Sequence, residues 1–161
     1  MMVPSTTPLE GGCNCEAIRY RLHAAPMFVH CCHCTWCQRE TGSAFALNAL
    51  IETAHVEVVE GTPARFHLAS ASGKGQDVLR CSACGVALWS HYAGLREKLA
   101  YVRVGTLDDP SAAPPSIHIF TSTKQPWVVL DGSVPAMEAF YRRSDQFSPE
   151  SYARYAALKD A

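Results

Sequence analysis

The chain of 161 residues has the length of one ordinary domain and is long enough to bury a hydrophobic core. Its 14 basic and 15 acidic residues leave a net charge of −1 without any run of five like charges, so no nucleic-acid partner is expected. The start, MMVPSTTPLEGG, lacks a signal-peptide pattern, and no stretch approaches the ~20 apolar residues of a membrane span. We therefore expect a cytoplasmic protein without a membrane partner.

Short segments with the character of β-strands follow one another along most of the chain. The segment AIRYRLH, residues 17–23, alternates apolar and basic side chains, which is typical of a half-buried strand. Turn signals such as GTP, SGKG and DDPSAAPP separate the further segments rich in β-branched and aromatic residues. These are 27–33, 44–51, 55–60, 64–69, 77–81, 86–92, 99–107 and 116–122. The pattern predicts a mainly β domain.

Two helices are predicted near the C-terminus. Residues 135–143, PAMEAFYRR, have the composition of a short helix. Residues 148–160 carry stronger signals, because Ser148 is a favourable cap and Pro149 suits the first helical position.

One face of the second helix would carry Tyr152, Tyr155 and Ala156. This face either packs against the domain or forms a dimer contact, so both a monomer and a homodimer fit the sequence. We expect one domain over residues 1–161, with a β core at about 9–135 and a helical extension at 136–161.

The eight cysteines indicate metal binding rather than a disulfide scaffold. They make up about 5% of the chain, below the ~8–10% of small disulfide-rich proteins. Seven of them fall in CxC or CxxC spacing, which favours metal ligation. These seven are Cys13, Cys15, Cys32, Cys34, Cys37, Cys81 and Cys84.

The first and last pairs predict one closed structural zinc site. In a strand, residues two apart point the same way, so Cys13 and Cys15 are able to grip one ion. In CSACG, a tight turn aims Cys81 and Cys84 at one point, and structural zinc takes four ligands. The alternative is that each pair forms a half-site completed by other side chains.

The middle cluster HCCHCTWC, beginning at His30, merges a CxC with a CxxC and offers three thiolates to a second metal. These are Cys32, Cys34 and Cys37. Strand alternation turns Cys31 and His33 to the opposite face, whereas His30 lies on the ligand face and would close the shell if it bound. Without His30, the metal keeps a vacant position, which distinguishes catalytic from structural zinc. A metal held by three anionic sulfurs suits a substrate thiolate or carbonyl oxygen better than hydrolysis by zinc hydroxide.

Four motifs in order resemble the glutathione-dependent formaldehyde-activating family, also called the centromere protein V-like family. They are GGCNC, CHCTWCQRETGSAF, RCSACGVAL and IHIFTSTKQPW. The resemblance implies a β-tent fold of curved antiparallel sheets, shared with Mss4-like zinc proteins. It also implies two zinc ions per chain, a structural one on the four outer cysteines and a catalytic one on Cys32, Cys34 and Cys37, with partial occupancy allowed at the second site.

The activity that the resemblance implies is that of a carbon-sulfur lyase acting between a glutathione-like thiol and an aldehyde such as formaldehyde. The protein must hold a thiolate beside the aldehyde carbon and stabilise the alkoxide that forms. Glutathione carries two carboxylates, which calls for cations such as Arg80. The predicted substrate contacts are Arg39, Thr41, Ser43, Lys124 and Trp127.

Two other functions fit the cysteine pattern. Both zinc ions would be structural in a non-enzymatic Mss4-like module, which ligation by His30 would favour. Alternatively, Cys31 and Cys32 would form a redox pair on a β-tent fold, which predicts a reversible disulfide in place of the second metal.

Overall fold

The structure is a computed structural model that describes residues 8–160, so most of the stretch searched for a signal peptide lies outside the described residues. Two sheets form the molecule, one with strand order β1-β2-β5 and one with order β10-β3-β4-β9-β8-β7-β6. The strands are β1 (Leu9–Gly12), β2 (Arg19–Leu22), β3 (Phe28–Cys32), β4 (Ala46–Glu52), β5 (Val56–Glu60), β6 (Ala64–Leu68), β7 (Gln76–Arg80), β8 (Ala87–Tyr92), β9 (Leu99–Arg103) and β10 (Ile117–Ile119). The helices are α1 (Thr35–Thr41), α2 (Arg143–Gln146) and α3 (Pro149–Asp160).

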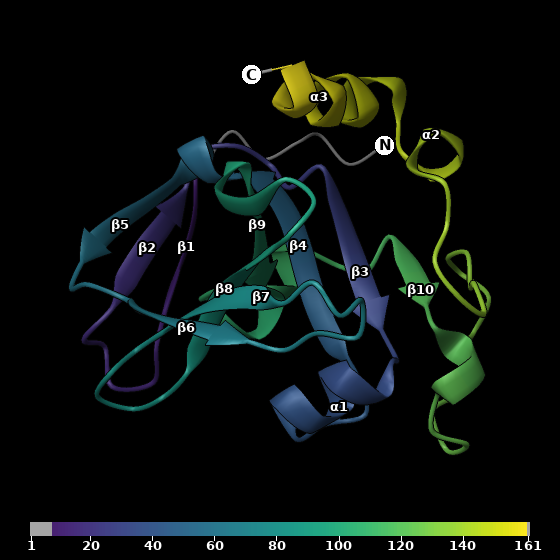
Figure 1. Cartoon of the computed structure of the whole chain (residues 1–161), viewed down its shortest axis with the longest axis horizontal. Helices are drawn as coiled ribbons and strands as arrows, with labels where there is room; N and C mark the ends of the chain where they lie inside the picture. The colour runs from purple at the N-terminus through teal and green to yellow at the C-terminus, as the bar shows by residue number, and fades with distance from the viewer. Residues whose placement is uncertain (1–7, 161) are drawn as a thin grey trace.

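Strand β3 lies near one edge of the larger sheet, where it pairs with two strands from distant parts of the chain. It runs antiparallel to β4, with Cys32 opposite Ala46. It runs parallel to β10, with His118 beside Cys31. In Figure 1 the three-stranded sheet lies on one side of the molecule, β10 lies at the other, and α3 crosses above the strands.

The larger sheet buries a different core on each face. On one face the apolar side of β2, including Tyr20 and Leu22, packs with residues such as Ile51. On the other face Phe28 and Leu50 pack with Phe147 from the C-terminal region. Because side chains alternate along each strand, β3 and β4 contribute to both cores. The C-terminal helices thus cover the face of the sheet opposite the smaller sheet.

The predicted mainly β architecture is confirmed, and each of the nine predicted strand segments contains a strand. The helix predicted at 135–143 is wrong, since only its last residue belongs to a helix. The backbone of this segment instead pairs with the free edge of β10: His118 donates to Pro135 O and Met137 donates to His118 O, both at 2.9 Å. Two elements were not predicted, the short strand β1 and helix α1.

Helix α3 begins as predicted, because Ser148 Oγ accepts the backbone N–H of Ser151 at 3.1 Å. Its expected apolar face is only partly buried: Tyr155 packs edge-on against Phe147, whereas Tyr152 stays 37% exposed. Within residues 8–160, no helix has both the length and the apolar character required to cross a membrane.

A largely buried ion pair between α3 and β4 fixes the helix to the sheet, and it leads to a prediction about stability. Arg154 donates to both carboxylate oxygens of Glu52, at 2.8 and 2.6 Å. Replacing Arg154 with alanine should lower the free energy of unfolding by about 1–2 kcal/mol in urea denaturation. The exposed Arg142→Ala control should change it by less than about 0.5 kcal/mol. Equal losses in both variants would contradict the anchoring role.

The same pair predicts a pH dependence. Burial acts to raise the pKa of Glu52, but the hydrogen bonds from Arg154, a backbone hydrogen bond and the nearby positive charges together hold the pKa below its usual value. A lowered folded-state pKa gives stability that is present above the unfolded pKa and is lost as the pH falls through the folded value. The difference between wild type and Arg154→Ala should therefore shrink on acidification below about pH 4. Urea titrations at several pH values would measure it, and a constant difference would contradict it.

Candidate metal centres and cavity

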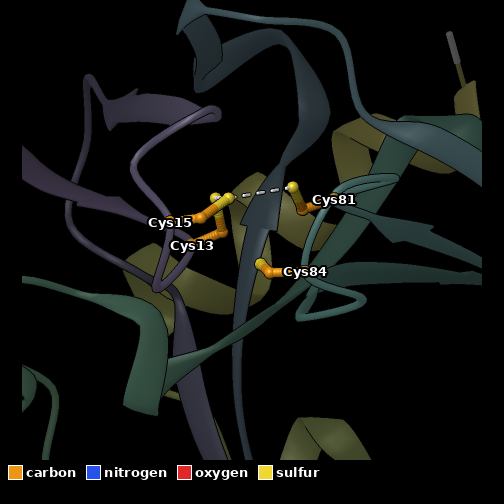
Figure 2. A group of neighbouring side chains, drawn as sticks. All are labelled: Cys13, Cys15, Cys81 and Cys84. Carbon is orange, nitrogen blue, oxygen red and sulfur yellow. Dashed lines mark hydrogen bonds between the residues drawn. The ribbon is translucent and has the colours of Figure 1, made fainter.

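The four outer cysteines meet between the two sheets. Cys13 and Cys15 come from the loop after β1, and Cys81 and Cys84 come from the loop after β7 (Figure 2). All four sulfur atoms lie within 4.8 Å of one another. The structure thus brings together two pairs separated by 65 intervening positions, the grouping expected from the four ligands that structural zinc takes.

The geometry of this group fits a tetrahedral metal. The Sγ atoms of Cys13 and Cys15 are 3.5 Å apart, and those of Cys15 and Cys81 are 3.7 Å apart. Zinc–sulfur bonds of about 2.3 Å place the sulfurs of a tetrahedron about 3.8 Å apart. Gly85, at a φ of 77°, allows the tight turn that aims Cys81 and Cys84 at one point. Four sulfurs fill such a shell, so this group could hold a metal but leaves no position for a substrate.

The three middle cysteines form a second, separate group. Cys32 ends β3, Cys34 caps α1, and Cys37 lies in the first turn of that helix. Their sulfurs also lie within 4.8 Å of one another, and no histidine or carboxylate of residues 8–160 joins them. Three soft donors fit a borderline-soft ion such as zinc with one position left open.

The thiol of Cys34 has the character of a metal ligand. Hydrogen bonds from Cys32 and then from Cys37 hold its pKa well below the usual value for a thiol. The backbone N–H of Cys37 also donates to Cys34 Sγ, at 3.4 Å. Because the thiolate is the form that binds metal, this arrangement favours ligation.

The other members of the cluster have different partners. His30 Nε2 lies 2.6 Å from the hydroxyl of Tyr141 and is therefore engaged away from the three sulfurs. Cys31 and His33 lie on the opposite face, as strand alternation predicted, where His33 Nε2 is 2.9 Å from His118 Nδ1. Burial raises the pKa of Cys31 to about 12, which keeps it a neutral thiol.

A cavity of about 330 Å³ opens beside the three cysteines. Its lining is largely apolar and aromatic, with contributions from β3, β8, β9, the segment after β10 and the C-terminal region. Besides the three cysteines, the lining includes Trp36, Tyr92, Tyr101, Phe120, Phe140 and Arg143. Trp36 is 46% exposed, and it forms one side of this opening.

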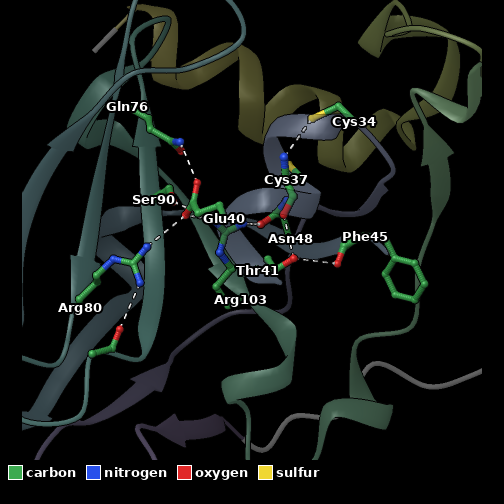
Figure 3. Close-up of polar contacts among 11 residues, drawn as sticks. Cys34, Cys37, Glu40, Thr41, Phe45, Asn48, Gln76, Arg80, Ser90 and Arg103 are labelled. Atoms are coloured by element: carbon green, nitrogen blue, oxygen red, sulfur yellow. Dashed lines mark hydrogen bonds and ion pairs between the residues drawn. The ribbon is translucent and has the colours of Figure 1, made fainter. Parts of the chain in front are cut away.

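An ion pair anchors the helix that carries Cys37. Glu40 lies one turn further along the same face of α1 and accepts from Arg103 at 2.7 Å and from Gln76 at 2.9 Å (Figure 3). Arg103, only 7% exposed, also donates to Asn48 and Ser90. This network fixes α1 to β4, β7, β8 and β9, and so holds Cys37 near Cys32.

The other side of α1 is tied to the motif after β10. Gln38 Nε2 donates to His33 O at 2.7 Å and to Thr123 O at 2.9 Å. Gln125 in turn donates to Gln38 Oε1 at 2.7 Å. The sequence motif IHIFTSTKQPW therefore supports the metal loop through the backbone of Thr123 and the side chain of Gln125.

The predicted substrate contacts lie elsewhere. Arg39 and Ser43 are exposed, and Trp127 is 72% exposed. Thr41 donates its hydroxyl to Cys37 O at 2.7 Å, and Lys124 donates to the backbone at Gln125 O and Val128 O. None of the five lines the cavity beside the three cysteines, so their contact with a substrate stays a prediction. Arg80 lies near Glu40 at 3.7 Å and is likewise outside the lining.

Sequence reasoning missed the residues that do shape the cavity. Glu40 lies three residues after Cys37, so its carboxylate could have been placed on the same side of a helix from the sequence. Its partner Arg103, however, is 63 positions away and could not have been identified in this way. Phe140 and Arg143 come from the segment assigned to a helical extension, and nothing in their spacing indicates the cavity.

The four-cysteine group generates a prediction about metal content. The Cys84→Ser variant should hold about one metal ion fewer per chain than wild type, measured by elemental analysis. Its melting temperature should fall by roughly 5 °C or more, since each kcal/mol lost shifts it by ~2–4 °C in a chain of this size. The Cys31→Ser control removes a buried thiol outside both groups and should keep the metal content. Unchanged metal content in Cys84→Ser would contradict the assignment.

The Glu40 network generates a second prediction. Removing the carboxylate in Glu40→Ala leaves the buried guanidinium of Arg103 without its ion pair, which should cost about 3 kcal/mol in urea denaturation. The exposed Glu60→Ala control should cost less than about 0.5 kcal/mol. A loss in Glu40→Ala no larger than in the control would show that the network does not hold α1.

Known proteins similar to this chain share the region that contains the two cysteine groups. A family described as glutathione-dependent formaldehyde-activating enzyme matches residues 8–123. A protein of Halomonas elongata, provisionally named a glutathione-dependent formaldehyde-activating enzyme, is 30% identical over 129 residues, covering 76% of this chain and 81% of the relative. A crystal structure of a Rhodobacter sphaeroides protein aligns with a TM-score of 0.49 and 17% identity, over 79% of this chain and 98% of that one. The family match covers most of the chain and includes both cysteine groups, so this chain belongs to the glutathione-dependent formaldehyde-activating enzyme family.

Proposed function

We propose that the protein is a zinc-dependent, lyase-type enzyme that forms or breaks an adduct between a thiol and an aldehyde at the three-cysteine centre. One observation carries the proposal: three thiols converge beside a cavity, and no fourth donor from residues 8–160 joins them. Such an incomplete donor set is typical of a catalytic metal site rather than a structural one.

The proposal assigns a different role to each cysteine group. Structural zinc would be held by the four outer cysteines, and catalytic zinc by Cys32, Cys34 and Cys37. When bound, the catalytic zinc supplies a Lewis-acidic charge that polarises a carbonyl oxygen or binds a thiolate. The chain's own contribution is to fix the three sulfurs through β3, the cap of α1 and the Glu40 network.

The reaction needs positioning more than it needs acid or base strength. A thiolate sulfur attacks the aldehyde carbon, the carbon-sulfur bond forms, and the π electron pair of the carbonyl moves to oxygen. That oxygen takes up one proton, which balances the proton lost by the thiol, so no redox partner is required. Tyr92 lines the cavity, and the role proposed for its hydroxyl is to donate a hydrogen bond to the developing alkoxide.

The reactants proposed are a glutathione-like thiol and an aldehyde such as formaldehyde, which agrees with the family description and with the name of the Halomonas elongata relative. The cytoplasmic location and the choice between monomer and homodimer stay predictions. The redox alternative has no support from geometry, because Cys31 and Cys32 fall in separate clusters on opposite faces of β3. A three-cysteine site closed by His30 also lacks support, because His30 Nε2 is hydrogen-bonded to the hydroxyl of Tyr141 and the histidine does not join the three sulfurs.

The test compares two cysteine variants in adduct formation. With zinc-loaded protein, wild type should accelerate the formation of S-hydroxymethylglutathione from glutathione and formaldehyde above the uncatalysed rate, followed by NMR. A catalytic metal ion stabilises the transition state by several kcal/mol, and Cys34→Ser removes one of its ligands. The reaction rate of this variant should therefore fall roughly 100-fold or more. Cys31→Ser, which changes the neighbouring thiol on the other face, should retain the wild-type rate.

Two outcomes would overturn the enzymatic proposal. The first is that wild type holding two zinc ions accelerates neither this reaction nor that of other thiol and aldehyde pairs. The second is that Cys34→Ser loses a zinc ion without any change in rate.

A further inference from the structure

One end of the cavity is built by residues that lie outside the family match. Phe140 and Arg143 line it, and both follow residue 123, where the match ends. Tyr141 lies between them and is held by its contact with His30 at 2.6 Å. The match to the family therefore accounts for the metal end of the cavity but not for this second end.

The two ends lie on the same side of β3. Cys32 and His30 are two residues apart, so they point to the same face at a spacing of about 6–7 Å. Phe28, two residues further back, stacks on Phe147 with ring centroids 4.6 Å apart, which brings α2 against the start of β3. Figure 1 shows α1 at the carboxyl end of β3 and α2 beyond its other end. The cavity thus extends from the three sulfurs toward Arg143.

Arg143 has no anionic partner within the described residues. Its guanidinium lies 5.1 Å from the ring centre of Phe140 and 4.7 Å from that of Tyr155. Its Nε is buried and makes no hydrogen bond, and none of the ion pairs within residues 8–160 includes it. Two aromatic faces support the charge, and apart from a contact with the hydroxyl of Tyr101, no side chain of residues 8–160 engages its donors, which leaves capacity for an anionic ligand.

The other ionisable groups of the lining do not compete for that role. Glu40 is occupied by Arg103, at 2.7 Å, and Lys74, which also lines the cavity, is exposed to solvent. His30 already has a partner, because its Nε2 lies 2.6 Å from the hydroxyl of Tyr141. Of the two cations in the lining, Arg143 is the one that lies against the ring of Phe140, at 5.1 Å from its centre.

We propose that the cavity takes a molecule with an apolar, preferably aromatic body and a single carboxylate, which pairs with Arg143. A volume of about 330 Å³ suits a small ligand of this kind. Glutathione fits less well, because it carries two carboxylates and an ammonium group, and the lining offers the ammonium no free carboxylate. The inference that this ligand is a reactant rests on the proposed function. The carboxylate would then belong to either the aldehyde or the thiol.

A binding measurement tests the inference without relying on turnover. The probes are phenylacetate, the uncharged phenylacetamide of the same shape, and acetate, which lacks the aromatic body. Binding to the zinc-loaded full chain is followed by calorimetry and by tryptophan fluorescence, to which Trp36 beside the cavity contributes. Phenylacetate should bind at least about tenfold more tightly than either of the other probes, since both the ion pair and the aromatic wall contribute.

Matched variants assign the charge preference to one residue. Arg143→Gln should lower the affinity for phenylacetate by about tenfold while leaving that for phenylacetamide unchanged. Arg143→Lys keeps the positive charge but lacks the paired donors of the guanidinium. Its affinity for phenylacetate should lie between those of wild type and Arg143→Gln. The neighbouring exposed Arg142→Gln should behave as wild type. The inference is overturned if wild type does not prefer phenylacetate, or if Arg143→Gln keeps the preference with its circular dichroism spectrum intact.

Turnover then identifies which reactant carries the carboxylate. One arm pairs carboxybenzaldehyde with a small neutral thiol, and the other pairs mercaptobenzoate with formaldehyde; benzaldehyde and thiophenol are the uncharged controls. In the arm that matches the reactant, Arg143→Gln should raise KM by about tenfold with little change in kcat. Charge-selective binding without adduct formation in either arm would overturn the proposed function but not the anion site. Adduct formation without charge preference would overturn only the anion site.

Discussion

The candidate site depends on the alternation of side chains along β3, a strand held on both sides. Its even-numbered residues from Phe28 to Cys32 face the C-terminal region and the cavity, whereas Val29 and Cys31 face the opposite way. The ladders with β4 and β10 both fix this register. A shift of one residue would exchange the two faces and send Cys31 toward the cavity in place of Cys32. The separation of one thiol from three therefore follows from strand pairing.

Coordination number, rather than exposure, separates the roles proposed for the two cysteine groups. Cys15 and Cys84 are exposed, yet with Cys13 and Cys81 they make a set of four that leaves a tetrahedral ion no free position. The other group is more deeply placed but has only three members, and the surrounding network of Glu40 and Gln38 supplies geometry without supplying a ligand. With metal bound, the exposed sulfurs of Cys15 and Cys84 would therefore belong to the centre that cannot bind a substrate.

Local patterns predicted the strands and the sorting of the cysteines, because both depend on spacing within a few residues. The period of two in AIRYRLH and the CxC and CxxC motifs state directly which side chains share a face. The pairing of Glu40 with Arg103 depends on contacts across 63 positions, which no local pattern encodes. The helix predicted at 135–143 failed for a related reason: the open edge of β10 offered the backbone of Met137 a partner, and this tertiary pairing outweighed local helix propensity.

The segment after residue 123 has a consequence for how this protein could diversify. It supplies Phe140 and Arg143 at one end of the cavity, while all seven cysteines of the two metal-ligand groups lie before it. Substitutions here would alter which molecules enter without disturbing a single sulfur, and exchange of this short tail between relatives would transfer selectivity while the reacting centre stays the same. Chemistry and choice of reactant are encoded in different stretches of one small chain.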